Sequence, residues 1–243
     1  IETFQRTMRN WSVSRLGLAK VTLPFLSLYV DGCRQGWHND ATNGRFAFVY
    51  SLTRNNRRTT GGETLVMHEG DPLRTHLAQP IAGRGLYDAI EPLFNRLVVF
   101  DDRMPHSVER VEGPMDTLEG RFVLHGHLSE GGTAAAGALP VTAVIEPLRE
   151  AIRAFHGETA TRLSLYHGII TFRLSIAPSG AVASCDIILD RVLHPDPGDV
   201  EWQPLRDSLL ARLRTVRFAA AEAETRVIQP VIFGRTPGTA AAP

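Results

Sequence analysis

The stretch SEGGTAAAGALP, residues 129–140, divides the chain into two parts with different sequence patterns. It is rich in glycine, alanine and threonine and has no charge after Glu130, which is typical of a flexible linker. We therefore predict one domain over residues 1–130, a linker over residues 131–140 and a second domain over residues 141–243. The length of 243 residues is compatible with two small domains.

The part before the linker has the pattern of a mainly β protein. Four segments rich in β-branched and aromatic residues are bounded by turn-forming residues, and they cover residues 21–30, 45–53, 96–101 and 121–128. Several short strands joined by turns indicate a sandwich or barrel. Pro24 predicts an edge or a bulge in the first segment. Residues 71–90 predict a helix or an irregular excursion.

The part after the linker predicts a small α+β domain. Apolar residues recur at helical spacing in residues 141–158 and again in residues 200–218. Between them, two alternating segments flank Pro178-Ser179-Gly180, a sequence that favours a β-hairpin turn. Residues 225–234 read as a closing strand.

Composition excludes several classes of protein. The 26 Lys and Arg residues balance the 26 Asp and Glu residues, so the basic bias of a nucleic-acid-binding protein is absent. Two cysteines, Cys33 and Cys185, are too few for a disulfide framework or a cysteine-rich zinc site. No apolar run reaches the roughly 18 residues that span a bilayer, and the first ten residues lack the apolar centre of a signal peptide. We expect a cytoplasmic protein that binds neither membrane nor nucleic acid.

The segment GWHND contains the first metal-binding candidates. His38 and Asp40 are two residues apart, and on a strand such residues point to the same face. His106 follows the strand-like segment RLVVF and supplies a third candidate ligand. Two histidines and one carboxylate on one face of an octahedron leave three positions open, the arrangement of non-haem iron(II) oxygenases. Each motif alone is common and is weak evidence for a metal site. The alternative roles are a turn residue for His38 and a capping residue for Asp40.

Residues 25–128 resemble the catalytic core of the prolyl-hydroxylase-like branch of the 2-oxoglutarate- and Fe(II)-dependent oxygenases. The runs LYVDGCRQGWHNDATNGRFAFVYSLT, TGGETLVM, FNRLVVFDDRMPHSVERV and RFVLHGHL follow the family's order. The resemblance implies a double-stranded β-helix, or jelly roll, with His38, Asp40 and His106 binding iron. It also implies 2-oxoglutarate and O2 as cosubstrates, with ascorbate as an additional reductant. Because halogenases of this kind lack the carboxylate, Asp40 favours hydroxylation, with desaturation or ring formation left open.

The family's basic residue, which binds the distal carboxylate of 2-oxoglutarate, corresponds by context to Arg121. An arginine suits this role because its planar guanidinium can form two parallel hydrogen bonds with a carboxylate. The 15 positions that separate Arg121 from His106 exceed the usual family spacing. Arg110 is the competing candidate, because it shares strand parity with His106.

Further residues near the cosubstrate follow from strand parity and from the resemblance. If Arg121 points into the barrel, then so do Val123, His125 and His127. His125 and His127 then either fill space and form hydrogen bonds, or they form a rival metal site. The rival site is disfavoured, because the sequence offers no obvious carboxylate partner for it. Tyr29, Tyr50 and Ser51 lie on neighbouring strands; each is a candidate for a hydrogen bond to 2-oxoglutarate or a simple packing residue.

The substrate and the second domain are the least constrained. The resemblance implies a prolyl or other residue in a peptide or protein, or a small amino-acid-like molecule. Arg54, Arg57 and Arg58 form either a solvated loop or a recruitment site for an acidic substrate. Residues 141–234 faintly resemble the C-terminal domain of TonB-like transducers, which implies docking of a partner or substrate, or dimerisation. A non-catalytic jelly-roll binding protein fused to an interaction module is the competing hypothesis.

Overall fold

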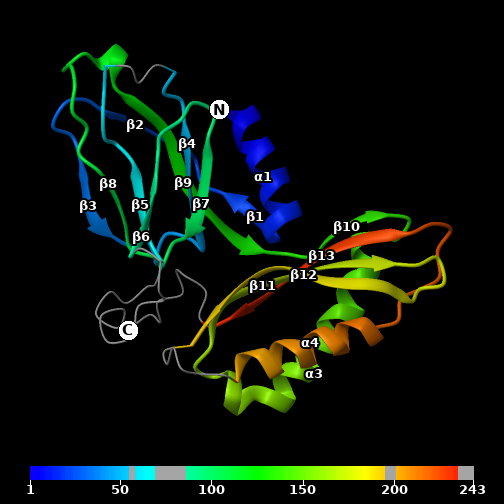
Figure 1. The fold of residues 1–243 in the computed structure, drawn as a ribbon. Coiled ribbons are helices and arrows are strands. Elements are labelled where there is room, and N and C mark those ends of the chain that lie inside the picture. The colour runs from blue at the N-terminus through cyan, green and yellow to red at the C-terminus, as the bar shows by residue number, and fades with distance from the viewer. Residues whose placement is uncertain (55–57, 69–85, 195–200, 235–243) are drawn as a thin grey trace, which may run out of the picture. The chain divides into compact units, whose positions relative to one another are not determined.

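The computed structural model describes residues 1–54, 58–68, 86–194 and 201–234, and the chain divides into two compact units (Figure 1). The first unit is Val21–Ser129. The second unit combines Glu2–Lys20 with the described residues from Glu130 to Gly234. No helix in the described ranges is long and apolar enough to cross a membrane.

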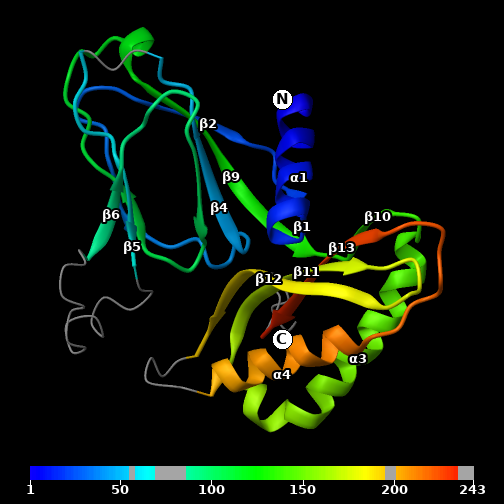
Figure 2. The same cartoon turned by 45° about the vertical axis from the view of Figure 1, so that its right-hand side comes forward.

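Two sheets build the first unit, which is mainly β. The larger sheet contains β9 (Arg121–Gly131), β4 (Phe46–Ser51) and β7 (Leu97–Asp101) in this order, with β2 (Phe25–Tyr29) also paired with β9. Strand β1 (Leu18–Val21), which precedes β2 along the chain, falls mainly in the segment Glu2–Lys20. The smaller sheet has the order β3 (Gln35–His38), β8 (His106–Val108), β5 (Thr64–Met67) and β6 (Tyr87–Ile90). In the larger sheet, β2 pairs with β9 and β4 pairs with both β7 and β9, each in antiparallel fashion. In the smaller sheet, the pairs β3–β8, β8–β5 and β5–β6 are also antiparallel. Figure 2 shows the two sheets on opposite sides of this unit.

The four predicted strand segments are confirmed, and they form the larger sheet. Pro24 lies between β1 and β2, where its lack of an N–H donor interrupts the pairing. The smaller sheet was missed by the sequence pattern, because its strands have only three or four residues. Of the excursion predicted at residues 71–90, residues 71–85 lie outside the described residues, and the end forms β6.

The N-terminal residues form a helix that the sequence analysis did not predict. Helix α1 (Glu2–Leu16) buries Met8, Ser12 and Leu16, which are four residues apart and therefore share one face. Its apolar stripe is too narrow for a clear amphipathic pattern. Gly17 ends the helix at φ 76°, a left-handed conformation that favours glycine. The structure groups this helix with the second unit, whereas we had predicted that residues 1–130 form one domain.

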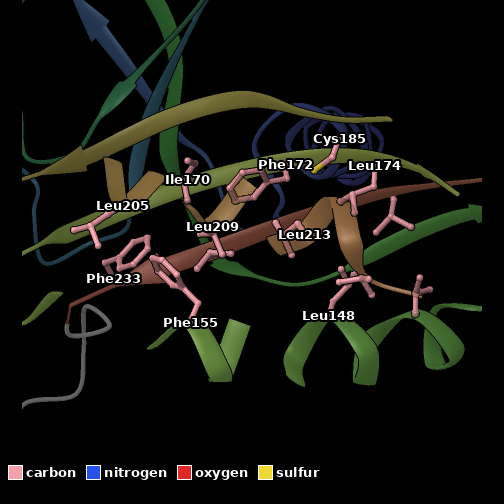
Figure 3. Packing of buried hydrophobic residues seen from close by; sticks show 14 of the residues in the cluster. Leu148, Phe155, Ile170, Phe172, Leu174, Cys185, Leu205, Leu209, Leu213 and Phe233 are labelled. Atoms are coloured by element: carbon pink, nitrogen blue, oxygen red, sulfur yellow. The ribbon is translucent and has the colours of Figure 1, made fainter. Parts of the chain in front are cut away.

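The second unit contains one antiparallel sheet and two further helices. The sheet order is β10 (Ala134–Gly137), β13 (Thr225–Phe233), β11 (His167–Ile176) and β12 (Val182–Leu193). Helices α3 (Val141–Leu163) and α4 (Trp202–Thr215) contribute Leu148, Phe155, Leu205, Leu209 and Leu213 to an apolar core against the sheet (Figure 3). The predicted hairpin and both predicted helices are present.

The predicted linker over residues 131–140 is wrong. Gly131 ends β9, and β10 pairs with β13 from Ala134 opposite Ile228 to Gly137 opposite Thr225. A Cβ atom at Gly137 would lie 2.3 Å from a main-chain oxygen, so the close approach requires glycine. The small residues, which we interpreted as a flexible linker, instead allow β10 to pair closely with β13.

Candidate metal centre

Three predicted ligands come together in the first unit. His38 ends β3 and His106 begins β8, and antiparallel pairing places these two residues opposite each other. One ligand atom from each of His38, Asp40 and His106 lies within 4.8 Å of the other two. Asp40 lies beyond the end of β3, so the strand-parity argument does not explain its position.

The chain path fixes the orientation of both histidine rings. The Nδ1 of His38 lies 2.8 Å from the carbonyl oxygen of Gly36, and the Nδ1 of His106 lies 3.0 Å from that of Met104. When each Nδ1–H donates to its carbonyl, each Nε2 keeps a lone pair for a metal ion. Burial lowers the pKa of His106, which favours the neutral ring that a metal ligand must have.

Asp40 is held by a tight turn rather than by a strand. The main-chain N–H of Asn43 donates to the Asp40 carbonyl at 2.8 Å, and the Asn43 side-chain amide donates to Oδ1 of Asp40 at 3.1 Å. The other carboxylate oxygen, Oδ2, lies 3.4 Å from the Nε2 of His106. Two imidazole nitrogens and one carboxylate oxygen are a donor set that suits Fe(II).

Arg121 is a buried cation that lacks a full set of partners. It begins β9 and is 3% exposed. One guanidinium nitrogen donates to Oγ1 of Thr64 at 3.0 Å, and the guanidinium carbon lies 4.9 Å from the centre of the Tyr29 ring. Its Nε is buried without a hydrogen-bond partner, and no carboxylate among the described residues forms an ion pair with it. Burial lowers the pKa of Arg121, so an anionic ligand would stabilise its charged form.

The competing Arg110 is exposed and does not line the cavity. The additional residues before Arg121 form a loop that includes the short 3-10 helix η1 (Thr117–Glu119), which is capped by the Asp116 side chain. The loop explains why the spacing from His106 to Arg121 is long.

A cavity of about 370 Å³ connects the candidate ligands with Arg121. This volume falls within the range of small-molecule sites, which is roughly 300–1,000 Å³. The cavity is lined by residues of both sheets, including His38, Asp40, His106, Thr64, Arg121, Tyr29, Val123, His125 and His127. The four alternate β9 residues that parity predicted to point inward are all part of this lining.

The remaining predicted site residues divide into two groups. Tyr29 and His125 line the cavity, and the Nε2 of His125 lies 2.8 Å from the Ser27 hydroxyl. Tyr50 donates its hydroxyl to Asn95, and Ser51 donates its hydroxyl to the carbonyl of Pro92 at 2.9 Å. Neither Tyr50 nor Ser51 belongs to the cavity lining as described.

Two of the three loop arginines have partners within the first unit. Arg58 forms an ion pair with Glu119 at 2.8 Å, and the Arg54 guanidinium lies 5.2 Å from the centre of the Phe94 ring. Arg57 lies outside the described residues. These contacts give Arg54 and Arg58 partners of their own and disfavour a free basic patch at these two residues.

Sequence reasoning missed Asp102, which is fully buried directly after β7. Its two carboxylate oxygens lie 3.2 and 3.1 Å from the Nδ1 of His127. Burial raises the pKa of Asp102 to about 6, although the hydrogen bond with His127 opposes the rise. Desolvation acts to lower the pKa of His127, but the hydrogen bond and the charges of Asp102 and Asp40 outweigh it, and the net effect is a raised pKa. In the sequence, the acidic pair Asp101-Asp102 at the end of β7 was the signal that could have pointed to this buried carboxylate.

Comparisons with known proteins agree with this site. Residues 24–129, somewhat less than half of the chain, match the model of the 2OG-Fe(II) oxygenase superfamily. No curated protein matches the chain.

Two solved structures show a partial likeness. A prolyl-4-hydroxylase from Pseudomonas putida is 20% identical with a TM-score of 0.39, and the match covers 54% of this chain and 65% of that one. An oxidoreductase of the 2OG-Fe(II) oxygenase family from Burkholderia pseudomallei is 19% identical with a TM-score of 0.39, and the match covers 54% and 57%. The chain thus spans less than two thirds of either structure, and at these scores the likeness carries no functional conclusion. Residues 24–129 are thus similar to the 2OG-Fe(II) oxygenase superfamily, and the donor set of His38, Asp40 and His106 fits that similarity.

Proposed function

We propose that this protein is a 2-oxoglutarate- and Fe(II)-dependent dioxygenase that hydroxylates an unactivated C–H bond. One observation carries the proposal: three metal-binding side chains and a buried, incompletely paired arginine line the same cavity. A binding protein without a metal or an anionic ligand would gain nothing from this arrangement, because burying an arginine without a counter-ion is costly.

Three of these residues would bind the metal ion, and the arginine would bind the cosubstrate. His38, Asp40 and His106 would hold Fe(II) through two Nε2 atoms and Oδ2. Arg121 would bind the distal carboxylate of 2-oxoglutarate, and the Thr64 hydroxyl and the Tyr29 ring orient its guanidinium. When bound, Fe(II) with O2 and 2-oxoglutarate would supply the oxidation of the C–H bond, with 2-oxoglutarate converted to succinate and CO2.

The substrate we propose is a prolyl or other residue of a peptide or protein, or a small amino-acid-like molecule. Phe25 lines the cavity and is 61% exposed, so the cavity reaches the surface beside β2. An aromatic side chain at that opening could contact an apolar ring such as that of proline.

The two sheets of the first unit support a double-stranded β-helix as its fold. We assign the second unit an accessory role, as a docking module for a substrate or partner or as a dimerisation element. Its core is apolar and its buried polar residues do not form a metal-binding group among the described residues.

Anaerobic addition of Fe(II) and then 2-oxoglutarate tests the proposed activity. A chelate of 2-oxoglutarate on Fe(II) should give a weak visible charge-transfer band, and admission of O2 should then give succinate. Succinate dissolved in place of 2-oxoglutarate is the control, because it lacks the keto group. If neither the band nor succinate formation appears, the protein is better described as a non-catalytic jelly-roll binder.

A further inference from the structure

Beside Asp40 lies a second polar group that the proposed reaction does not use. Asp102 is fully buried, and both its carboxylate oxygens lie within 3.2 Å of the Nδ1 of His127. The other ring nitrogen of His127, Nε2, lies 4.0 Å from Oδ2 of Asp40. His127 therefore stands between two carboxylates, one of which is a proposed metal ligand.

The structure holds this pair tightly in place. The main-chain N–H of His127 donates to the Thr22 hydroxyl at 2.9 Å, which fixes the base of the side chain. A Cβ atom at Gly44 would lie 2.7 Å from Oδ2 of Asp102 and 2.9 Å from the Cβ of His127. Only a glycine leaves room for both side chains at that position.

Asp102 contacts Asp40 by two routes. The Asp102 carbonyl accepts the main-chain N–H of Asp40 at 2.8 Å, and the Asp102 carboxylate holds the imidazole that faces Asp40. On its other side, Oδ1 of Asp40 accepts the Asn43 amide. Oδ1 thus faces Asn43, whereas Oδ2 faces the Nε2 of His106 at 3.4 Å and the Nε2 of His127 at 4.0 Å.

We propose that Asp102 and His127 are positioning residues that set the orientation of Asp40 in the metal centre. This proposal rests on the proposed function. Asp40, Asp102 and His127 themselves have ligand atoms within 4.8 Å of one another, but the Nδ1 of His127 is taken up by the Asp102 carboxylate, so we assign the pair to holding Asp40 and not to a second metal site. Outer contacts of this kind typically change metal affinity about 10–100-fold when removed.

Metal titration of the apo protein tests the pair without turnover. Co(II) is added anaerobically to the wild type and to His127→Leu, His127→Gln and Asp102→Asn, and both affinity and the visible Co(II) spectrum are recorded. Leucine fills a volume similar to that of histidine but removes the polar contact, whereas glutamine can still reach Asp40 with an amide nitrogen. We expect about 10–100-fold weaker binding and an altered spectrum for His127→Leu, about tenfold weaker binding for Asp102→Asn, and recovery to within about threefold for His127→Gln.

Controls separate positioning from a general loss of structure. His156→Leu replaces a half-buried histidine of the second unit that stacks on Phe233, and it should bind Co(II) like the wild type. Circular dichroism checks that each variant is folded. Should His127→Leu not fold, the isosteric Asp102→Asn decides the question.

The outcomes distinguish this proposal from the proposed function. If the wild type binds Co(II) and both His127→Leu and Asp102→Asn match its affinity and spectrum, the positioning role is overturned while the oxygenase assignment stands. Equal loss in His127→Leu and His127→Gln with a normal Asp102→Asn also contradicts it. If the wild type binds no metal ion, both proposals fail.

Discussion

The two units place their polar residues very differently. In the first unit, buried polar side chains such as Thr64, His106 and Arg121 gather around a cavity. In the second unit, the cores of α3, α4 and the sheet form one continuous apolar cluster. Burying polar groups costs free energy unless each finds a partner. The contrast suggests that the first unit gives up stability for chemistry, whereas the second unit is built mainly for stability.

Replacement of the metal ligands should have the largest effect. His38→Ala, Asp40→Ala or His106→Ala each removes one of three donors, so succinate formation without added substrate should fall to the level seen without enzyme. Thermal unfolding of the apo variants should change little by comparison. Full turnover in any one variant would exclude that residue as a ligand, and the polar cavity would then need another explanation.

Shortening a buried side chain in the apolar core of the second unit should lower the free energy of unfolding without changing metal binding. Leu209 is fully buried in α4, and Leu209→Ala should lower the free energy of unfolding by about 2–5 kcal/mol. Urea denaturation followed by circular dichroism measures the loss. Co(II) affinity at low urea should stay within about twofold of the wild type, because a core deletion of this kind acts on unfolding rather than on ligand donors. A parallel fall in metal affinity would show that the two regions are not independent.

Arg121→Ala should weaken cosubstrate binding to an intermediate degree. Loss of charge-assisted hydrogen bonds worth about 1.5–3 kcal/mol corresponds to a roughly 10–100-fold higher Kd for 2-oxoglutarate. The exposed Arg110→Ala is the matched control and should leave the Kd unchanged. Titration of the charge-transfer band measures both. The reverse result would move the anion site from the cavity to the surface loop.

The smallest expected effect is a difference in alkylation rate between the two cysteines, one of which lies in each unit. Burial raises the pKa of Cys185 in the second unit to about 11, and its side chain is 1% exposed. Below that pKa the thiol stays protonated and unreactive, so its alkylation should be negligible near pH 8 and should rise toward pH 11. Cys33 in the first unit is half-buried and should react faster with iodoacetamide, as peptide mass spectrometry can show. Equal rates near pH 8 would contradict the tight core inferred for the second unit.

The candidate ligands were easier to predict from the sequence than the contacts that position them. His38, Asp40, His106 and Arg121 were all identified from their order and context, and they line one cavity. The tight turn that presents Asp40 was not predicted, because it depends on the Asn43 side chain. Asp102 and its pairing with His127 were also missed, since the partners are 25 positions apart and only the folded sheet brings them together.

Long elements with a regular period were predicted from the sequence, and elements defined by their neighbours were not. The hairpin around Gly180 and the helix over Trp202–Thr215 follow local rules of turn chemistry and periodicity. Strand β10 has only small residues, and its conformation comes from pairing with β13. Helix α1 shows the same limit, because only one narrow stripe of it is buried.

The rings of His38 and His106, the two candidate imidazole ligands, are oriented by main-chain carbonyls two residues earlier, at Gly36 and Met104. A main-chain acceptor remains when the side chain around it changes. Substitutions at Met104 that preserve the chain path should therefore leave the ring of His106 in place. The region around the metal centre could then diverge in sequence, or be varied by mutagenesis to accept new substrates, without rebuilding the support of these two ligands. The Asp40 carboxylate lacks this freedom, because the group that donates a hydrogen bond to it is the side chain of Asn43.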